Sequence, residues 1–241
     1  MRIAIISDIH GNLPALINVL DDIQAREIQQ VYCLGDLTDF APWPNECIHL
    51  IKTLNIPCIQ GNHDQWIAED SAIVSLAHHS PEEARVREIA INHSKAIVTG
   101  DNKIFLGELP FQIRLDYRIG NKHWQILLVH AHPDSNNQHL YEDEPDETFA
   151  FLLEREQADA LVMGHTHYSF IKAIDSKWAI NCGSVGRSKE ANRDASYLII
   201  EICKDRIVPE IIQLDFNKSS VRNAIKNSDI PDFYADFWDA K

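Results

Sequence analysis

The strongest constraint on the fold is a repeated pairing of a short apolar run with a small polar cluster that follows it. Residues 3–6 lead into Asp-Ile-His at 8–10, and residues 31–34 lead into Gly-Asp at 35–36. Three further runs, at 56–59, 123–129 and 160–162, lead into Gly-Asn-His-Asp at 61–64, His130 and Gly-His-Thr-His at 164–167. Short runs rich in β-branched residues are typical of buried strands. Because the carboxyl ends of such strands lie along one sheet edge, we expect the clusters to meet there.

The order of periodic segments predicts an α/β chain. Apolar residues at helical spacing follow the first two runs, beginning near Asn12 and Pro44. A strand–helix–strand–helix–strand order implies parallel pairing with right-handed crossovers. From residue 111 the period becomes two, with a hairpin turn at Gly120-Asn121, and a helix is expected at about 147–156. The later strands, expected near 169–174, 178–180, 197–202 and 207–214, favour a more antiparallel second half.

Length and composition predict one domain over residues 1–241, because a chain of 241 residues with 45% apolar side chains can bury a large core. Residues 66–110 lack a strand pattern and are expected to form a helical insertion beside the sheet. Residues 218–240 are expected to form a helical tail split at Pro231.

Charge and cysteine content exclude several classes of protein. A formal net charge of −14 disfavours binding to nucleic acid. Five scattered cysteines without a CxxC pair indicate reduced thiols in a cytoplasmic protein, and they argue against a thiolate metal site. No apolar run reaches the ~18–20 residues of a membrane-spanning helix, and the apolar start is too short for a signal peptide. We therefore expect a cytoplasmic protein without a membrane partner; the sequence does not indicate its oligomeric state.

Apart from Asp64, the polar clusters would bring two Asp, one Asn and five His side chains together. Carboxylate and amide oxygens with imidazoles suit divalent metal ions, and residues at i and i+2 of an extended segment can hold one ion together. Eight such groups exceed what one ion needs, so two ions bridged by a carboxylate are the natural count. Two-metal sites suit in-line displacement at phosphorus, in which a hydroxide held between the cations attacks and no side-chain nucleophile is required.

The five clusters follow one another as DxH, GD, GNHD, H and GHTH over residues 8–167. This joint pattern resembles the calcineurin-like metallophosphoesterases. The opening SDIHGNLPAL and the later NCGSVGR and DASY segments are similar to the compact bacterial and archaeal phosphodiesterases of that superfamily. The resemblance implies an α/β fold, a four-layer α/β/β/α sandwich of two mixed sheets flanked by helices.

The resemblance also implies a role for each polar residue. One metal ion would be held by four of them, Asp8, His10, Asp36 and His167. Asp36 would bridge to a second ion completed by three more, Asn62, His130 and His165. His63 would not bind metal; it would face the scissile phosphate, stabilising the transition state or protonating the leaving oxygen. Asp39 resembles the second aspartate of the protein-phosphatase GDxxDRG loop, which holds the catalytic histidine, although the Arg-Gly that follows it there is absent here.

Three more residues have less specific expectations. Asp64 is expected to anchor its loop rather than to take part in chemistry. Arg187, beside the Gly-Ser-Val-Gly segment, is a candidate for substrate binding through phosphate recognition. His132 follows His130 by two residues, so contact with phosphate and a supporting or surface role both remain open.

The sequence therefore predicts a dinuclear metal-dependent phosphoesterase. It would hydrolyse phosphodiester or related small phosphate-ester bonds, including those of nucleotides, by attack of a metal-bridging hydroxide. Manganese is the expected metal, with iron, zinc, nickel and magnesium open. The alternatives are a dinucleoside polyphosphate hydrolase, a serine/threonine protein phosphatase and a metal- and phosphate-binding regulatory module without turnover.

Overall fold

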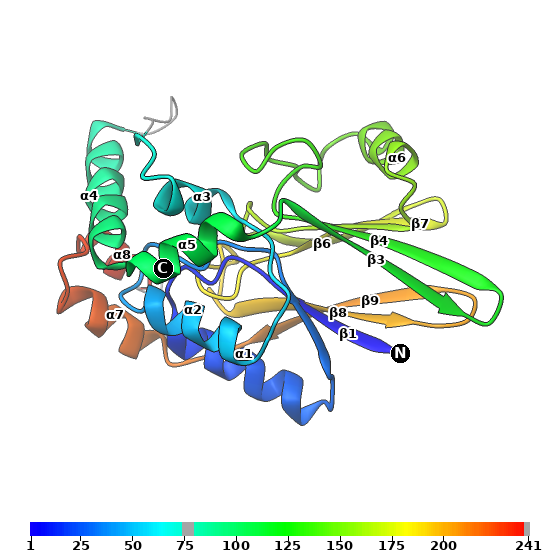
Figure 1. Cartoon of the computed structure of the whole chain (residues 1–241), viewed down its shortest axis with the longest axis horizontal. Coiled ribbons are helices and arrows are strands. Elements are labelled where there is room, and N and C mark those ends of the chain that lie inside the picture. The colour runs from blue at the N-terminus through cyan, green and yellow to red at the C-terminus, as the bar shows by residue number, and fades with distance from the viewer. Residues whose placement is uncertain (74–79, 239–241) are drawn as a thin grey trace.

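The strands form two mixed sheets in a computed structural model that describes residues 1–73 and 80–238. The first sheet has the order β2-β1-β8-β9, and the second has the order β3-β4-β5-β7-β6 (Figure 1). The strands of the first sheet are β1 (Arg2–Ile6), β2 (Gln30–Cys33), β8 (Ala195–Ile202) and β9 (Ile207–Leu214). Those of the second are β3 (Gln112–Ile119), β4 (Lys122–Val129), β5 (Ala160–Met163), β6 (Ser169–Ile174) and β7 (Lys177–Cys182).

Parallel pairing occurs where the polar clusters follow strands. β1 is parallel to β2 and antiparallel to β8, while β5 is parallel to both β4 and β7. The carboxyl ends of β1, β2, β4 and β5 therefore point toward the same edge of the two-sheet stack.

Three apolar layers hold the stack together. Alternate residues of β1 face opposite ways: Ile3 and Ile5 pack between the two sheets, whereas Ala4 and Ile6 pack under the helices. α1 (Leu13–Ala25) and α2 (Pro44–Thr53) cover the outer face of the first sheet, and α6 (Asp146–Arg155) covers the outer face of the second (Figure 1). The expected four-layer α/β/β/α sandwich is confirmed.

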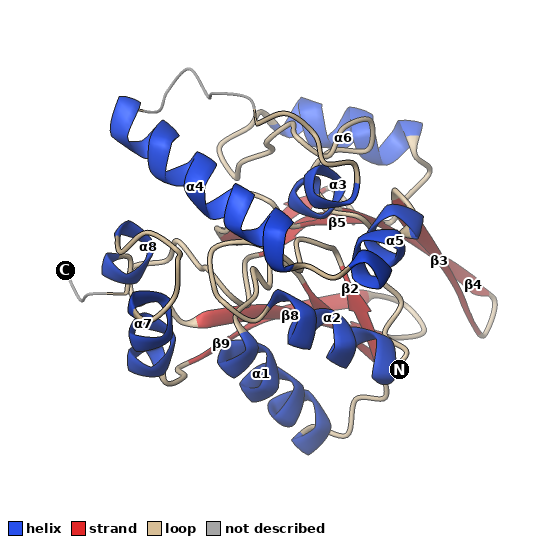
Figure 2. Cartoon of the chain, turned by 60° about the vertical axis from the view of Figure 1, so that its left-hand side comes forward, coloured by secondary structure: helices blue, strands red, loops and turns tan. Residues whose placement is uncertain are grey.

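The segments at 66–110 and 218–240 contain helices joined by turns and short irregular stretches where the structure describes them. α3 (Asn62–Ala68), α4 (Pro81–Ile97) and α5 (Gly100–Glu108) occupy the first, of which residues 74–79 lie outside the described residues. α7 (Lys218–Lys226) and α8 (Phe233–Asp236) occupy the second, and residues 239–241 lie outside. α4 and α8 lie on the same side of the molecule, at the left of Figure 2. None of the described helices combines the length and apolarity needed to cross a membrane.

The expected strand at 56–59 does not form. This segment makes only a single parallel bridge, between Cys33 and Cys58. Pro57 has no backbone N–H to give to a ladder. Gln60 then turns away from β2 and donates its N–H to the carbonyl of Pro110 at 2.8 Å. The GNHD cluster therefore follows a bridge rather than a strand, and it begins α3 directly.

Candidate metal centre and active-site cleft

The loops after β1 and β2 bend sharply to present their polar side chains. Asp8, His10 and Asp36 have φ values of 54°, 49° and 54°, in the left-handed region that aspartate and histidine tolerate better than most residues. The Gly-Ser-Val-Gly segment fixes the first loop, because the Gly186 N–H and the Ser184 hydroxyl both donate to the Asp8 carbonyl, at 3.0 and 2.7 Å. The strained loop is therefore held from both sheets.

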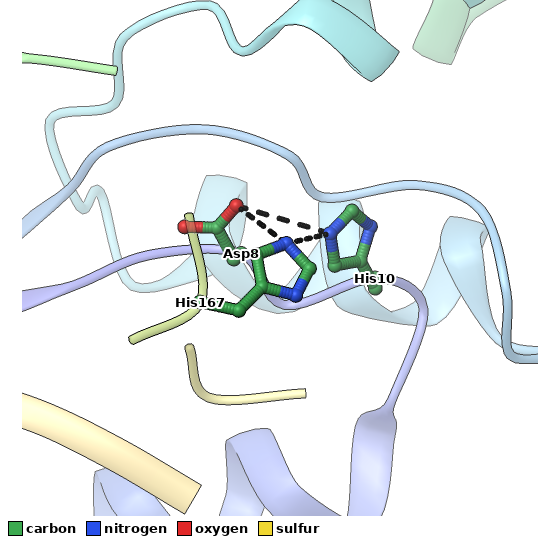
Figure 3. Close-up of side chains that lie close together, drawn as sticks. All are labelled: Asp8, His10 and His167. Atoms are coloured by element: carbon green, nitrogen blue, oxygen red, sulfur yellow. Dashed lines mark hydrogen bonds and ion pairs between the residues drawn. The ribbon is translucent and has the colours of Figure 1, made fainter. Parts of the chain in front are cut away.

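Asp8, His10 and His167 form the first group of possible metal ligands (Figure 3). Asp8 Oδ1 lies 3.2 Å from His167 Nε2 and 3.8 Å from His10 Nε2. The two Nε2 atoms lie 3.1 Å apart. All three side chains are buried, and Asp8 Oδ1 has no hydrogen-bond donor in the described part of the chain. A buried carboxylate oxygen without a donor is costly unless a cation lies next to it.

Backbone carbonyls determine which nitrogen of these rings carries the proton. The Nδ1 atoms of His10, His167 and His130 face the carbonyl oxygens of Thr38, Arg187 and Leu34 at 2.8–2.9 Å. Because a carbonyl only accepts, each Nδ1 must carry a proton and each neutral ring offers its Nε2 lone pair to the site. The lone pairs of His10 and His167 then face each other at 3.1 Å, which is repulsive without a cation between them.

Asp36 and His130 extend the site into a second group that shares Asp8. Asp36 Oδ2 lies 3.7 Å from His10 Nε2 and 3.5 Å from His130 Nε2, so it lies between the two groups. Asn62 Oδ1 lies 2.9 Å from His130 Nε2.

His165 lies beside the second group rather than in it. Its ring centroid is 5.1 Å from that of His130, and its buried Nε2 has no partner among the described residues. Every residue that the sequence suggested as a ligand is thus in or next to one cluster.

The protonation states of the cluster suit metal binding. Burial lowers the pKa values of His10, His130 and His165, and it lowers the pKa of His167 to about 4, so these rings are neutral at pH 7. Burial opposes ionisation of Asp8, but the positive charge that His167, His130 and His10 carry when they are protonated outweighs burial and lowers the pKa of Asp8. Burial and the neighbouring Asp8 raise the pKa of Asp36.

These buried oxygen and nitrogen donors contain no thiolate, and they fit divalent ions of the manganese, iron and zinc type. The fit rests on the orphaned Asp8 Oδ1 and on the opposed lone pairs of His10 and His167. The centre is therefore a plausible site for divalent metal.

Asp64 joins the two loops that carry Asp36 and Asn62. Its Oδ2 accepts N–H bonds from Asp36 at 2.7 Å and Gly61 at 3.1 Å, and its Oδ1 accepts one from Leu37 at 2.9 Å. Burial raises the pKa of this fully buried carboxyl to about 7, although the three amides oppose that shift. Gly61 must lack a side chain here, because a Cβ atom would collide with Asp36.

His63 lies next to the metal centre and is oriented by Asp39. The Nδ1 atom of His63 lies 2.5 Å from Asp39 Oδ2, and Asp39 is fully buried. The imidazole ring packs between Trp66 and Phe40, with ring centroids 4.6 and 5.0 Å away. With Nδ1 directed at the carboxylate, Nε2 is the nitrogen that is open to the cleft.

A cleft of about 340 Å³ opens over the metal centre. Asp36, Asn62, His63, His165 and His167 lie at its base, and its walls come from α3, α4, α8 and the loops near residues 137–139 and 187–189. Arg187 lines the cleft, as the sequence suggested for a substrate-binding residue. His132 does not line it. Its Nδ1 instead accepts the N–H of Asp134 at 3.1 Å, within a turn that begins at His132.

Several wall residues had no signal in the sequence. Arg87 of α4, His139, Phe233 and Tyr234 of α8 all line the cleft. They belong to no motif, and they reach the site only through the packing of the helical segments. Lys189, three residues after Gly186, also lines the cleft.

Comparisons with known proteins agree with this geometry. The sequence profile of the Calcineurin-like phosphoesterase superfamily domain matches residues 1–205. An uncharacterized protein of Methanocaldococcus jannaschii is 31% identical over 243 residues, covering 93% of this chain and 92% of that protein.

Two crystal structures are similar over their whole length. A metallophosphoesterase from Sphaerobacter thermophilus is 24% identical with a TM-score of 0.76, covering 100% of this chain and 98% of its own. A hypothetical protein from Pyrococcus horikoshii is 20% identical with a TM-score of 0.79, covering 98% of this chain and 97% of its own. Fold, cluster of ligands and sequence profile agree, and this chain belongs to the calcineurin-like phosphoesterase superfamily.

Proposed function

We propose that this protein is a dinuclear metal-dependent phosphodiesterase acting on small phosphate esters, with manganese as its working metal. The observation that carries the proposal is the pair of facing lone pairs on His10 and His167, beside the orphaned oxygen of Asp8. Asp8, His10 and His167 would hold one ion, and Asp36 would bridge to a second ion held by Asn62, His130 and His165. When bound, the ions would supply a hydroxide nucleophile at neutral pH and neutralise charge on the phosphoryl oxygens.

His63 and Arg187 would act on the substrate, and Asp39 would position His63. Asp39 holds Nδ1 of His63, so that Nε2 can hydrogen-bond the phosphoryl group or give a proton to the leaving oxygen. Arg187 would bind the substrate from the wall of the cleft. The cleft volume of about 340 Å³ favours a small ester over a phosphoprotein.

A cytoplasmic location is part of the same proposal. All five cysteines are free. Cys33 and Cys58 remain thiols although they are direct partners in a β-bridge, which suits a reducing compartment.

The test is hydrolysis of bis-p-nitrophenyl phosphate and p-nitrophenyl phosphate by protein that is stripped of metal and reloaded with manganese. We expect turnover of the diester that is lost in EDTA and in Asp36→Ala, with the variant also losing bound metal. Iron, zinc, nickel and magnesium are compared in the same assay.

Other outcomes distinguish the alternatives. Preference for a phosphopeptide over the diester would support a protein phosphatase. Turnover of dinucleoside polyphosphates alone would support a dinucleoside polyphosphate hydrolase. If the protein binds two ions but hydrolyses none of these substrates, the proposed enzymatic function is wrong and a metal- and phosphate-binding module is favoured.

A further inference from the structure

We propose that Arg187 and Lys189 form a subsite for a second anionic group of the substrate, distinct from the phosphoryl group that is cleaved. The inference rests on the proposed phosphodiesterase function and narrows its substrate class. The preferred substrate would be a phosphate diester or anhydride that carries an additional phosphate.

The guanidinium of Arg187 is held by aromatic rings rather than by a carboxylate. Its Cζ lies 4.3 Å from the centroid of Phe40, 4.9 Å from that of Phe237 and 5.4 Å from that of Tyr234. No acidic side chain lies within ion-pair distance of it in residues 1–73 and 80–238. Aromatic faces fix the position of a guanidinium without neutralising it, so its hydrogen-bond donors remain available to an anion.

Lys189 is a second cation in the same cleft, and it forms no salt bridge with an acidic side chain among the described residues; the charge of Asp8 acts on it only from beyond salt-bridge distance. Its Nζ lies 5.9 Å from the centroid of the Tyr168 ring. Arg187 and Lys189 line the same cleft, two residues apart in the chain. Two cations that oppose each other's charge raise the free energy of the empty cleft, and a bound anion relieves that cost.

A single phosphodiester does not need this charge. Its phosphoryl group carries one negative charge, and the metal centre together with His63 already faces it. The chain as a whole has a net charge of −14, so two cations without a salt bridge in its active-site cleft give the cleft a charge opposite in sign to that of the whole protein. A second phosphate on the substrate is the group that these cations suit, because phosphate is recognised by guanidinium and ammonium donors.

The C-terminal tail helps to position Arg187 in this subsite. Tyr234 and Phe237 supply two of the three rings around Arg187, and Tyr234 packs on Phe40 with ring centroids 4.9 Å apart. Phe40 follows Asp39 in the loop after β2. The rings around Arg187 therefore connect the C-terminal tail to the loop that orients His63. Tyr234 and Phe237 are positioning residues for Arg187.

Two pairs of probes that differ by one phosphate test the inference on the manganese-loaded protein. The substrates are p-nitrophenyl thymidine 5′-phosphate and the same diester with a 3′-phosphate. The ligands for calorimetry are thymidine 5′-phosphate and thymidine 3′,5′-bisphosphate, which need no turnover. We expect the bisphosphate to bind at least about tenfold more tightly, as expected for one charge-assisted contact, and the 3′-phosphorylated substrate to have the lower KM.

The variants assign that preference to residues. Arg187→Gln and Lys189→Gln should each abolish most of the preference for the second phosphate, whereas Lys189→Arg should retain it. Phe237→Leu should weaken the preference, and Phe237→Tyr should leave it intact. Arg118→Gln, an exposed arginine of β3, is the matched control and should leave it unchanged.

Equal binding of both thymidine ligands by the wild type, or a preference that survives Arg187→Gln with Lys189→Gln, would overturn the subsite. Equal hydrolysis of both diesters together with equal binding overturns the subsite and leaves the phosphodiesterase intact. A binding preference that depends on Arg187, without hydrolysis of either diester, supports the subsite and overturns the proposed function.

Discussion

Replacing Asp64 should strongly destabilise this protein, although Asp64 lies outside the ligand set. The carboxylate is fully buried and accepts three backbone N–H bonds, from Asp36, Leu37 and Gly61, at 2.7–3.1 Å. Asp64→Ala leaves all three amides buried without an acceptor. Bonds to a charged acceptor are worth about 1.5–3 kcal/mol each, partly offset by release of the buried charge. We expect a loss of about 3–5 kcal/mol in the free energy of unfolding.

Asp64→Asn sharpens the experiment. The amide keeps one acceptor oxygen, but its NH₂ group replaces the oxygen that faces the amides of Asp36 and Gly61. We therefore expect Asn to cost nearly as much as Ala, about 3 kcal/mol. Asp175→Asn is the control, because Asp175 is exposed in a turn with φ of 54°, which Asn also adopts, and it should change stability by less than ~0.5 kcal/mol.

The assay is urea unfolding and calorimetry of metal-free protein in EDTA, so that altered metal affinity does not contribute. For a chain of this size, a loss of 4 kcal/mol corresponds to a fall in Tm of about 10 °C. If Asp64→Asn unfolds within 1 kcal/mol of the wild type, the three amides find other acceptors and the reasoning is wrong.

Three further predictions follow from the same geometry. His63→Asn should retain both ions by elemental analysis but lose about 10²-fold or more in turnover, and stoichiometric loss of metal would contradict its assignment as a group that acts on substrate. Gly186→Ala should fold poorly and show a lower Tm than Gly100→Ala, because its Cβ would collide with the carbonyl of Ile9 while Gly100 has open space; equal Tm values would show that the loop can shift. Removing metal with EDTA should lower Tm, and manganese at 100 times its Kd should restore about 2.7 kcal/mol of the free energy of unfolding for each ion bound; a Tm indifferent to metal would argue against these ligands.

The strand-end clusters could be predicted because their constraints are local. Buried strands such as residues 3–6 are apolar on both faces, and Asp8 and His10 must follow directly to reach the sheet edge. The grouping of Asp8, His10 and His167 across 157 residues follows from sheet topology once the strands are recognised.

What could not be predicted depends on packing between distant segments. Pro57 and the contact of Gln60 with Pro110 prevent a strand that composition alone favours. Tyr234 lines the cleft because α8 packs against Phe40, and nothing near residue 234 indicates that contact. His132 was a candidate by its spacing from His130, but a turn to Ser135 directs it elsewhere.

The position of β1 between β2 and β8 bears on the order in which a ribosome can deliver this site. Asp8 and His10 leave the ribosome first, yet β1 has no partner on one side until residues 195–202 emerge. His167 and the Gly186 amide that holds the Asp8 loop also come later than β1, and Tyr234 and Phe237, two of the three rings around Arg187, follow β8. We therefore expect Asp8 and His10 to remain unassembled in the nascent chain at least until residues 195–202 have emerged.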